Sequence, residues 1–198
     1  MQSGDALRWA DMNGNGTTDV VISQAQSSPG EKILVIDLVP EGKPHLLVNI
    51  ENGLCLRITL SHESSTAQLV RAEAAGTPWT SRMPLAITVV SRVVEEDGLG
   101  NVSEQKITYR DPYYDPVKQE FRGFQGAETV QMGDASAPSL VSRVAFDAGR
   151  VTTCLKGRLL SEDMVGEDGK LFQRTVNTWS ERVLDSGLET DQDMGNYE

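Results

Sequence analysis

The sequence has few residues of the kinds that most often carry catalysis or cross-links. It has two cysteines and two histidines in 198 residues, and 6% of its residues are aromatic. Cys55 and Cys154 fit no metal-ligand spacing and no CxxC pattern, so we expect unpaired, mostly buried thiols rather than a disulfide. No apolar run approaches the ~20 residues of a membrane span. We therefore expect no direct membrane insertion.

The N-terminus shows no basic segment followed by an apolar one, so no signal peptide is visible. Residues 6–20 look like the middle of a repeat, which leads us to expect an excerpt of a longer chain. The net charge is -11, from 18 basic and 29 acidic residues. That balance argues against nucleic acid or an anionic membrane as the main partner, because both attract basic surfaces. It is compatible with cation binding.

Short β-branched runs separated by Gly, Pro, Asn and Asp dominate the chain, and long amphipathic helical patterns are rare. This pattern predicts an all-β fold. One short helix is expected in residues 67–75, ended by Gly76-Thr77-Pro78. The expected strands cover residues 6–11, 19–23, 32–38, 45–50, 54–60, 85–95, 105–109, 128–132, 140–146 and 172–179.

One segment has the pattern expected of a metal-binding loop, D-x-N-x-N-G-x-x-D. The alternation can direct three oxygen-bearing side chains to the inside of a tight turn, followed by a backbone carbonyl and a closing carboxylate. Such hard oxygen ligands suit calcium. The candidate structural calcium site consists of Asp11, Asn13, Asn15, Thr17 and Asp19.

This loop is not an EF-hand, because Ile22 stands where a bidentate Glu is expected and the flanking residues are typical of strands. With two carboxylates in the set, calcium binding would be weak, on the order of 10⁻⁴–10⁻³ M. An Asn/Gly-rich hairpin stabilised by Asx turns, without metal, explains the same residues. Both interpretations remain open from the sequence.

Catalytic motifs are lacking. Ser61-His62-Glu63 has the residue types of a triad, but consecutive side chains of a strand diverge. No nucleophile elbow, P-loop or H-E-x-x-H pattern occurs. We therefore expect no enzymatic activity.

The tyrosine-rich segment 109–116 has two interpretations. Exposed and clustered, Tyr109, Tyr113 and Tyr114 would form a platform for a glycan. Buried, they would pack the edge of a sheet, while the two Asp-Pro steps would enforce turns. In the following segment, Phe121 and Phe124 are expected to be core anchors, and Gly123 is expected to allow close backbone approach.

Three blocks of the sequence together resemble a known family. Residues 7–16 look like the loop of an FG-GAP/VCBS propeller blade, residues 52–93 contain G-T-P-W and M-P-L segments, and residues 109–124 contain Y-Y-D and Q-E-F-R-G-F. Their order resembles the B component of insecticidal toxin complexes, whose shell is related to Rhs/YD-repeat proteins. The resemblance implies the end of a propeller blade in residues 1–30 and a β-rich shell segment in residues 31–184. Residues 185–198 would form an acidic, mobile tail.

The resemblance also implies a function. The chain would be a non-enzymatic structural part of a secreted bacterial toxin complex, contributing to a β-shell that encapsulates a toxic effector. Its partners would be the C component, which closes the shell, and the pore-forming A component. The alternative is an extracellular adhesin, a calcium-stiffened β module that binds a glycan or a protein. Exposure of the three tyrosines would distinguish these two functions.

Overall fold

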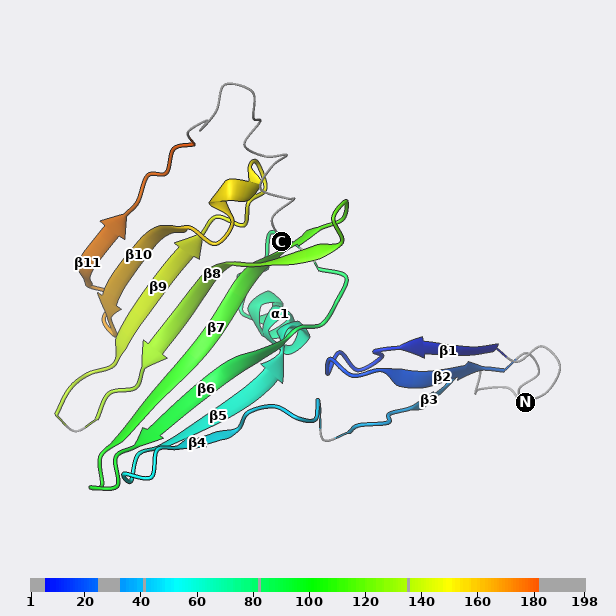
Figure 1. The fold of residues 1–198 in the computed structure, drawn as a ribbon, viewed down its shortest axis with the longest axis horizontal. Helices are drawn as coiled ribbons and strands as arrows, with labels where there is room; N and C mark the ends of the chain where they lie inside the picture. Colours follow the sequence, from blue (N-terminus) through cyan, green and yellow to red (C-terminus); the bar gives the residue numbers. More distant parts are fainter. Residues whose placement is uncertain (1–5, 25–32, 41, 82, 135, 182–198) are drawn as a thin grey trace.

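The computed structural model describes residues 6–24, 33–40, 42–81, 83–134 and 136–181. These residues form two antiparallel sheets and one α-helix, which confirms the predicted all-β class (Figure 1). The predicted acidic tail at residues 185–198 lies outside the described residues.

The first sheet has three strands in the order β1-β2-β3. They are β1 (Ala6–Ala10), β2 (Asp19–Ser23) and β3 (Ile33–Ile36). The candidate metal loop joins β1 to β2, where Ala10 pairs with Asp19. Because β3 pairs with β2, this sheet extends beyond the boundary expected at residue 30.

The second sheet has eight strands, and each strand pairs with its neighbours in the chain. Helix α1 (Ser65–Ala74) interrupts this meander between the second and third strands, and a 3₁₀ turn (Thr153–Leu155) precedes the seventh. The strands are β4 (Asn49–Glu51), β5 (Arg57–Ser64), β6 (Thr88–Glu96), β7 (Val102–Asp115), β8 (Glu120–Gln131), β9 (Leu140–Phe146), β10 (Leu159–Gly166) and β11 (Leu171–Val176).

Several strand boundaries differ from the predicted ones. β2 and β9 match, β10 was missed, and β7 and β8 are longer than expected. The run predicted at residues 54–60 begins instead at Arg57, because the Asn52 side chain accepts from the Leu54 and Leu56 N–H groups and forms a turn. Cys55 therefore lies in that turn and is exposed, which contradicts its predicted burial. Cys154 is half-buried, and both thiols are unpaired as predicted.

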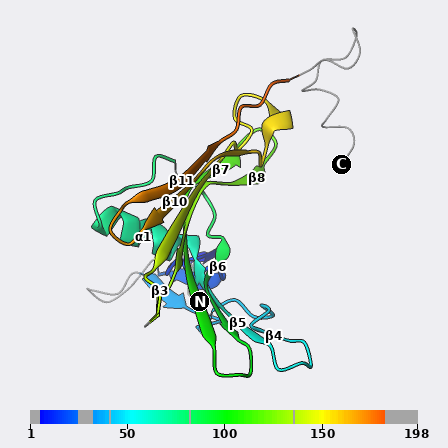
Figure 2. The same ribbon diagram turned by 90° about the vertical axis from the view of Figure 1, so that its left-hand side faces the viewer.

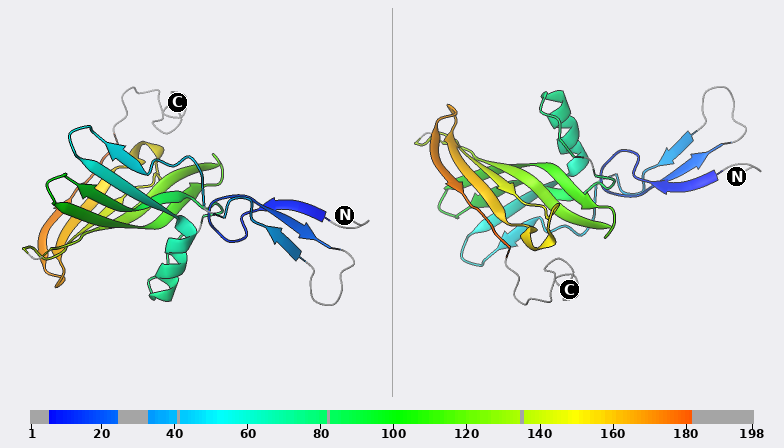
Figure 3. Two further views of the ribbon diagram at one scale, coloured as in Figure 1. Left: turned by 90° about the horizontal axis from the view of Figure 1, so that it is seen from below. Right: turned by 90° about the horizontal axis from the view of Figure 1, so that it is seen from above.

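Helix α1 is defined by caps at both ends. The Ser64 hydroxyl accepts from the Ala67 N–H at the N-terminus. At the C-terminus the Gly76 N–H bonds the Glu73 carbonyl and the Thr77 N–H bonds the Ala72 carbonyl, the Schellman pattern that stops a helix. The predicted helix and its stop are confirmed, and Figure 3 shows α1 projecting away from the sheet.

The strand register gives the eight-stranded sheet two different faces, because cross-strand partners lie on the same face. We call one the charged face, since its residues form cross-strand ion pairs. We call the other the neutral face. Its charged residues in the paired strands are Glu95 and Glu162. The charged face carries Glu51, Arg57, Arg92, Glu96, Glu104, Lys106, Glu128, Arg143, Asp163 and Arg174. The neutral face carries mainly Ile58, Leu60, Val93, Gln105, Ile107, Thr129, Gln131, Ser142, Val144 and Met164.

Among the residues that the structure describes, no second layer of secondary structure covers either face. Figure 2 shows the sheet from its β11 edge as one twisted layer. Within the described part of the chain, the buried apolar side chains are Val89, Pro112, Ala148 and Val165, a small core for this length. The edge strands β4 and β11 each leave one side unpaired. Hydrogen bonds and ion pairs therefore contribute an unusually large part of the interactions that hold the strands, turns and helix in place.

Candidate functional site

The loop between β1 and β2 is folded around the Asp11 carboxylate. Its Oδ1 accepts from the Gly14 N–H (2.7 Å) and the Asn15 N–H (3.1 Å), and its Oδ2 accepts from the Gly16 N–H (2.9 Å). Gly14 and Gly16 have φ of 72° and 85°, which glycine adopts without strain. The sequence pattern thus specifies a tight turn whose N–H groups converge on one carboxylate.

The two asparagines continue this pattern. Asn13 Oδ1 accepts from the Asn15 N–H (3.0 Å), and Asn15 Oδ1 accepts from both the N–H and the hydroxyl of Thr17 (2.7 and 2.6 Å). Asn13 Nδ2 donates to Asp37 (2.8 Å), just after β3. The structure brings four of the predicted residues into one loop, and these contacts are the Asx turns of the metal-free alternative.

Asp19 closes the loop, and its carboxylate is buried with one oxygen that accepts no hydrogen bond. It is 0% exposed, and its Oδ2 accepts from the Met12 N–H (2.9 Å). Its Oδ1 is buried without a hydrogen-bond partner. Buried polar atoms are normally paired, so an orphaned carboxylate oxygen fits a site for a cation.

The donor set of this loop is oxygen only. Among the residues that the structure describes, no three or more His, Cys, Asp or Glu side chains come together as a metal site. A cation here would therefore be held by the carboxylates of Asp11 and Asp19 together with the amide oxygens of Asn13 and Asn15 and the Thr17 carbonyl. Calcium accepts such mixed oxygen sets.

The outer side of the loop contacts the second sheet. The Ser64 hydroxyl, which caps α1, donates to the Gly14 carbonyl. A Cβ on Gly14 would lie 2.8 Å from the Thr66 side chain, and one on Gly16 would lie 3.2 Å from that of Thr88. Side chains at either glycine would push the loop away from α1 and β6, so the glycines serve this contact as well as the turn.

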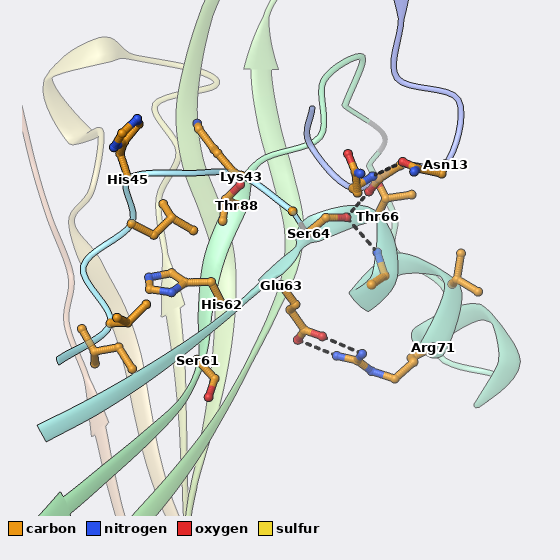
Figure 4. A pocket seen from close by; sticks show the side chains of 18 residues that line it. Asn13, Lys43, His45, Ser61, His62, Glu63, Ser64, Thr66, Arg71 and Thr88 are labelled. Carbon is orange, nitrogen blue, oxygen red and sulfur yellow. Dashed lines mark hydrogen bonds and ion pairs between the residues drawn. The ribbon is translucent and has the colours of Figure 1, made fainter. Parts of the chain in front are cut away.

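A groove of about 860 Å³ opens beside this junction, between the loop, residues 42–48, the end of β5 and α1 (Figure 4). Both histidines, His45 and His62, line it. Figure 4 shows Ser61 and His62 pointing to different sides of β5. Glu63 is engaged by Arg71 through two hydrogen bonds (2.6 and 2.7 Å). Ser61-His62-Glu63 therefore does not converge into a triad.

Gln68 of α1 bonds to β7 at the part of β7 that no longer pairs with β6. It is 1% exposed, its amide oxygen accepts from the Tyr109 N–H (2.6 Å), and its amide nitrogen donates to the Ile107 carbonyl (3.2 Å) and to Glu63 (2.7 Å). The pairing of β6 with β7 ends at Lys106, so Gln68 takes the place of the missing strand. Burial raises the pKa of Glu63, but the hydrogen bonds from Arg71 and Gln68 and the charge of Arg71 together lower it by more, so the pKa lies below its ordinary value.

A buried ionic cluster fastens the far end of the β7–β8 hairpin. The Arg122 side chain, 3% exposed, contacts Asp115 (2.6 Å), Glu120 (3.3 Å) and the Gly149 carbonyl (2.6 Å). Lys156 pairs with Glu120 (2.7 Å), a hydrogen bond that holds the pKa of Glu120 below normal. The cluster ties the hairpin to the loop between β9 and β10.

The tyrosines predicted to be either exposed or packed are half-buried in β7. Tyr109 lies against Phe124, with ring centroids 4.9 Å apart, and its burial raises its pKa. The guanidinium of Arg150 lies over the Tyr113 ring at 4.8 Å. No open aromatic platform is formed by these side chains.

Two predictions in this segment need correction. The step at Asp111 forms an irregularity within β7, not a turn, because the Asp111 carboxylate accepts from Thr80 and the strand resumes after Pro112. A Cβ on Gly123 would meet nothing within 4 Å, so this glycine is required by its φ of 105° and not by close approach. Phe121 and Phe124 contact each other, with ring centroids 5.4 Å apart, but both are half-buried and neither is among the buried apolar side chains, so the expected core position is not shown.

No helix of the described residues is long and apolar enough to cross a membrane. The family described as "Insecticide toxin TcdB middle/N-terminal region" matches residues 1–147. No curated protein matches the sequence.

Two solved structures share the fold. The Photorhabdus luminescens Tc holotoxin pore matches with a TM-score of 0.66 and 18% identity, and TcdB2-TccC3 without its hypervariable C-terminal region matches with a TM-score of 0.65 and 20% identity. Each match covers 84% of this chain and 10% of the solved chain. The sequence therefore spans about a tenth of the length of those chains.

Proposed function

The chain belongs to the family of the insecticide toxin TcdB middle/N-terminal region, and on that premise we propose that it is a non-enzymatic wall segment of a secreted bacterial toxin complex. In this proposal the eight-stranded sheet, closed with a C component, helps to enclose a toxic effector. The three-stranded sheet is the end of a propeller blade that faces the pore-forming A component.

The observation that carries the proposal is the uncovered single-layer sheet. A sheet this wide, with four buried apolar side chains among the residues that the structure describes, needs neighbours on its edges and on at least one face. The two solved structures of similar fold are toxin complexes in which the match covers 10% of the solved chain, which is consistent with neighbouring strands supplied by the rest of such a chain.

The two faces suggest which side of the wall faces inward. Cross-strand ion pairs suit a surface in water, where charged side chains keep their hydration. The neutral face, with its Gln, Ser, Thr and aliphatic side chains and with Glu95 and Glu162 as the charged residues of its paired strands, would present little fixed charge to an unfolded effector of variable sequence. We therefore assign the charged face to the outside and the neutral face to the lumen.

The adhesin alternative requires an accessible recognition surface. The half-burial of Tyr109, Tyr113 and Tyr114 weakens it, because these side chains pack within the sheet and under Arg150.

A matched pair of threonines tests the wall. Thr129 lies on the neutral face and Thr108 on the charged face, since they pair with Ile107 and Glu128 respectively. In the full-length B protein, with native cysteines replaced by serine, Thr129→Cys and Thr108→Cys would be labelled with a large PEG-maleimide before and after assembly with the C component.

We expect assembly to protect Thr129→Cys and to leave Thr108→Cys reactive, while denaturation exposes both. Equal labelling of the two positions in the assembled complex would overturn the wall assignment and favour a binding module. Protection of Thr108→Cys alone would still support a wall segment, but with the charged face toward the lumen and the neutral face outside.

A further inference from the structure

We infer that the loop of residues 11–19 holds a calcium ion, and that this ion stabilises the joint between the three-stranded and the eight-stranded sheet. The inference goes beyond the wall function, because it assigns a ligand and a mechanical role to one loop and holds whichever face of the sheet lies inward.

The evidence for a cation begins with Asp19. Its carboxylate is 0% exposed and has no ion-pair partner within the described residues, and one of its oxygens accepts no hydrogen bond. Burying a carboxylate in this way is costly unless a positive charge compensates it. The second carboxylate of the loop, Asp11, lies eight residues earlier in the same turn and can share that charge.

The donor chemistry selects the type of cation. The loop offers carboxylate, amide and carbonyl oxygens and contains neither His nor Cys, so zinc and other ions that prefer nitrogen or sulfur are poorly served. Magnesium demands a small octahedral site and retains its waters, whereas calcium accepts six to eight oxygens in irregular geometry. A calcium ion is the best match to a turn of this composition.

The same loop is the contact between the two sheets. The Gly14 carbonyl accepts from the Ser64 hydroxyl, which also caps α1, and Gly14 and Gly16 lie directly against Thr66 and Thr88. A cation on the inner side of the turn would fix the Gly14 carbonyl and its neighbours. The N-terminus of α1 would then be held more firmly against the loop.

Two measurements on the full-length B protein, the form used in the labelling experiment, test this inference. Isothermal titration with calcium alone reports binding, and hydrogen exchange reports the protection of the amides of the loop and of the first turn of α1. With a dissociation constant on the order of 1 mM, 10 mM calcium should increase protection in the loop by roughly tenfold, since a ligand bound only by the closed form suppresses opening.

Two variants test calcium binding and the stabilisation of the contact between the sheets separately. Asp19→Asn should abolish calcium binding and, without calcium, should be at least as resistant to heat as the parent chain, because it removes the uncompensated buried charge. Ser64→Ala should bind calcium normally, but protection of the α1 amides should no longer increase with it. The calcium response of the loop amides should persist in that variant.

Three results would overturn the inference. They are no heat of binding at millimolar calcium, unchanged binding in Asp19→Asn, or an Asp19→Asn chain that is less stable than the parent without calcium. If calcium still increased the protection of the α1 amides in Ser64→Ala, the calcium site would stand but its proposed role in stabilising the joint would be wrong. None of these outcomes depends on the labelling experiment, so the two proposals fail separately.

Discussion

Ion pairs of the same residue types occur in two settings within one sheet. On the charged face, Glu128, Arg143, Asp163 and Arg174 form a row across four strands, and the Arg143 side chain is 49% exposed. At the far end of the β7–β8 hairpin, Arg122 is 3% exposed and contacts two carboxylates and a carbonyl. The pairs look alike in chemistry and differ in their access to water.

That difference separates two roles. Exposed pairs gain little, because water and salt screen them and two long side chains lose freedom. A buried guanidinium cannot lose its partners without leaving an uncompensated charge. In a sheet with almost no apolar core, the buried cluster therefore fixes the position of the hairpin, while the exposed row keeps one face hydrated and the strands in register.

The largest effect is expected at Arg122. Arg122→Met keeps much of the side-chain volume but leaves Asp115 and Glu120 facing each other without their shared partner. Removal of one member of a buried pair typically costs about 3–5 kcal/mol of unfolding free energy. Urea denaturation followed by tryptophan fluorescence would measure the loss.

A matched control is Arg122→Met combined with Asp115→Asn, because Glu120 keeps its pair with Lys156 (2.7 Å) in both variants. Neutralising Asp115 removes the carboxylate that has lost its ion-pair partner, so part of the lost stability should return. No recovery would mean that packing by the Arg122 side chain, not its charge, holds the hairpin.

The sequence predicts the local features of this molecule well. Turn residues and β-branched runs predicted β2 and β9, and Gly76-Thr77-Pro78 predicted the end of α1. The pattern of residues 11–19 brought Asp11, Asn13, Asn15, Thr17 and Asp19 into one loop, because most of the hydrogen bonds that shape it join residues within this nine-residue segment. Local chemistry is enough where partners are close in sequence.

The sequence did not predict the contacts between distant residues. Gln68 caps a strand 39 and 41 positions away, and nothing in its neighbours marks it as buried. Arg122 lies within the Q-E-F-R-G-F segment, but its partner Gly149 follows 27 residues later. Asp37 reaches Asn13 only because β3 joins the first sheet. Such pairs become visible once the strand order is known.

An intermediate effect is expected at Glu63, whose side chain is 21% exposed, between Arg122 at 3% and Arg143 at 49%. Its pKa in the folded chain is below its ordinary value of 4.5. Stability from its contacts with Arg71 and Gln68 is therefore present above pH 4.5 and lost as the pH falls through the lowered pKa. The unfolding free energy of Glu63→Gln should be lower than that of the parent at pH 7, and the difference should shrink by pH 3.

Urea denaturation at several pH values would measure this slope. Glu167→Gln, in the exposed turn between β10 and β11, is the control and should follow the parent curve at every pH. A difference for Glu63→Gln that stays constant with pH would show that the lost hydrogen bonds, not the charge, account for it.

The smallest effect is expected in the exposed row. Arg143→Met removes the pair with Glu128 (2.7 Å) and should reduce the unfolding free energy by at most about 1 kcal/mol, because both side chains remain solvated. Arg143→Glu should cost more, since it places a third carboxylate between Glu128 and Asp163, and high salt should reduce that cost. Urea denaturation at low and high salt would measure both. If Arg143→Met cost as much as Arg122→Met, exposure would not distinguish the two settings, and the row would have to be regarded as part of the structural framework of the sheet.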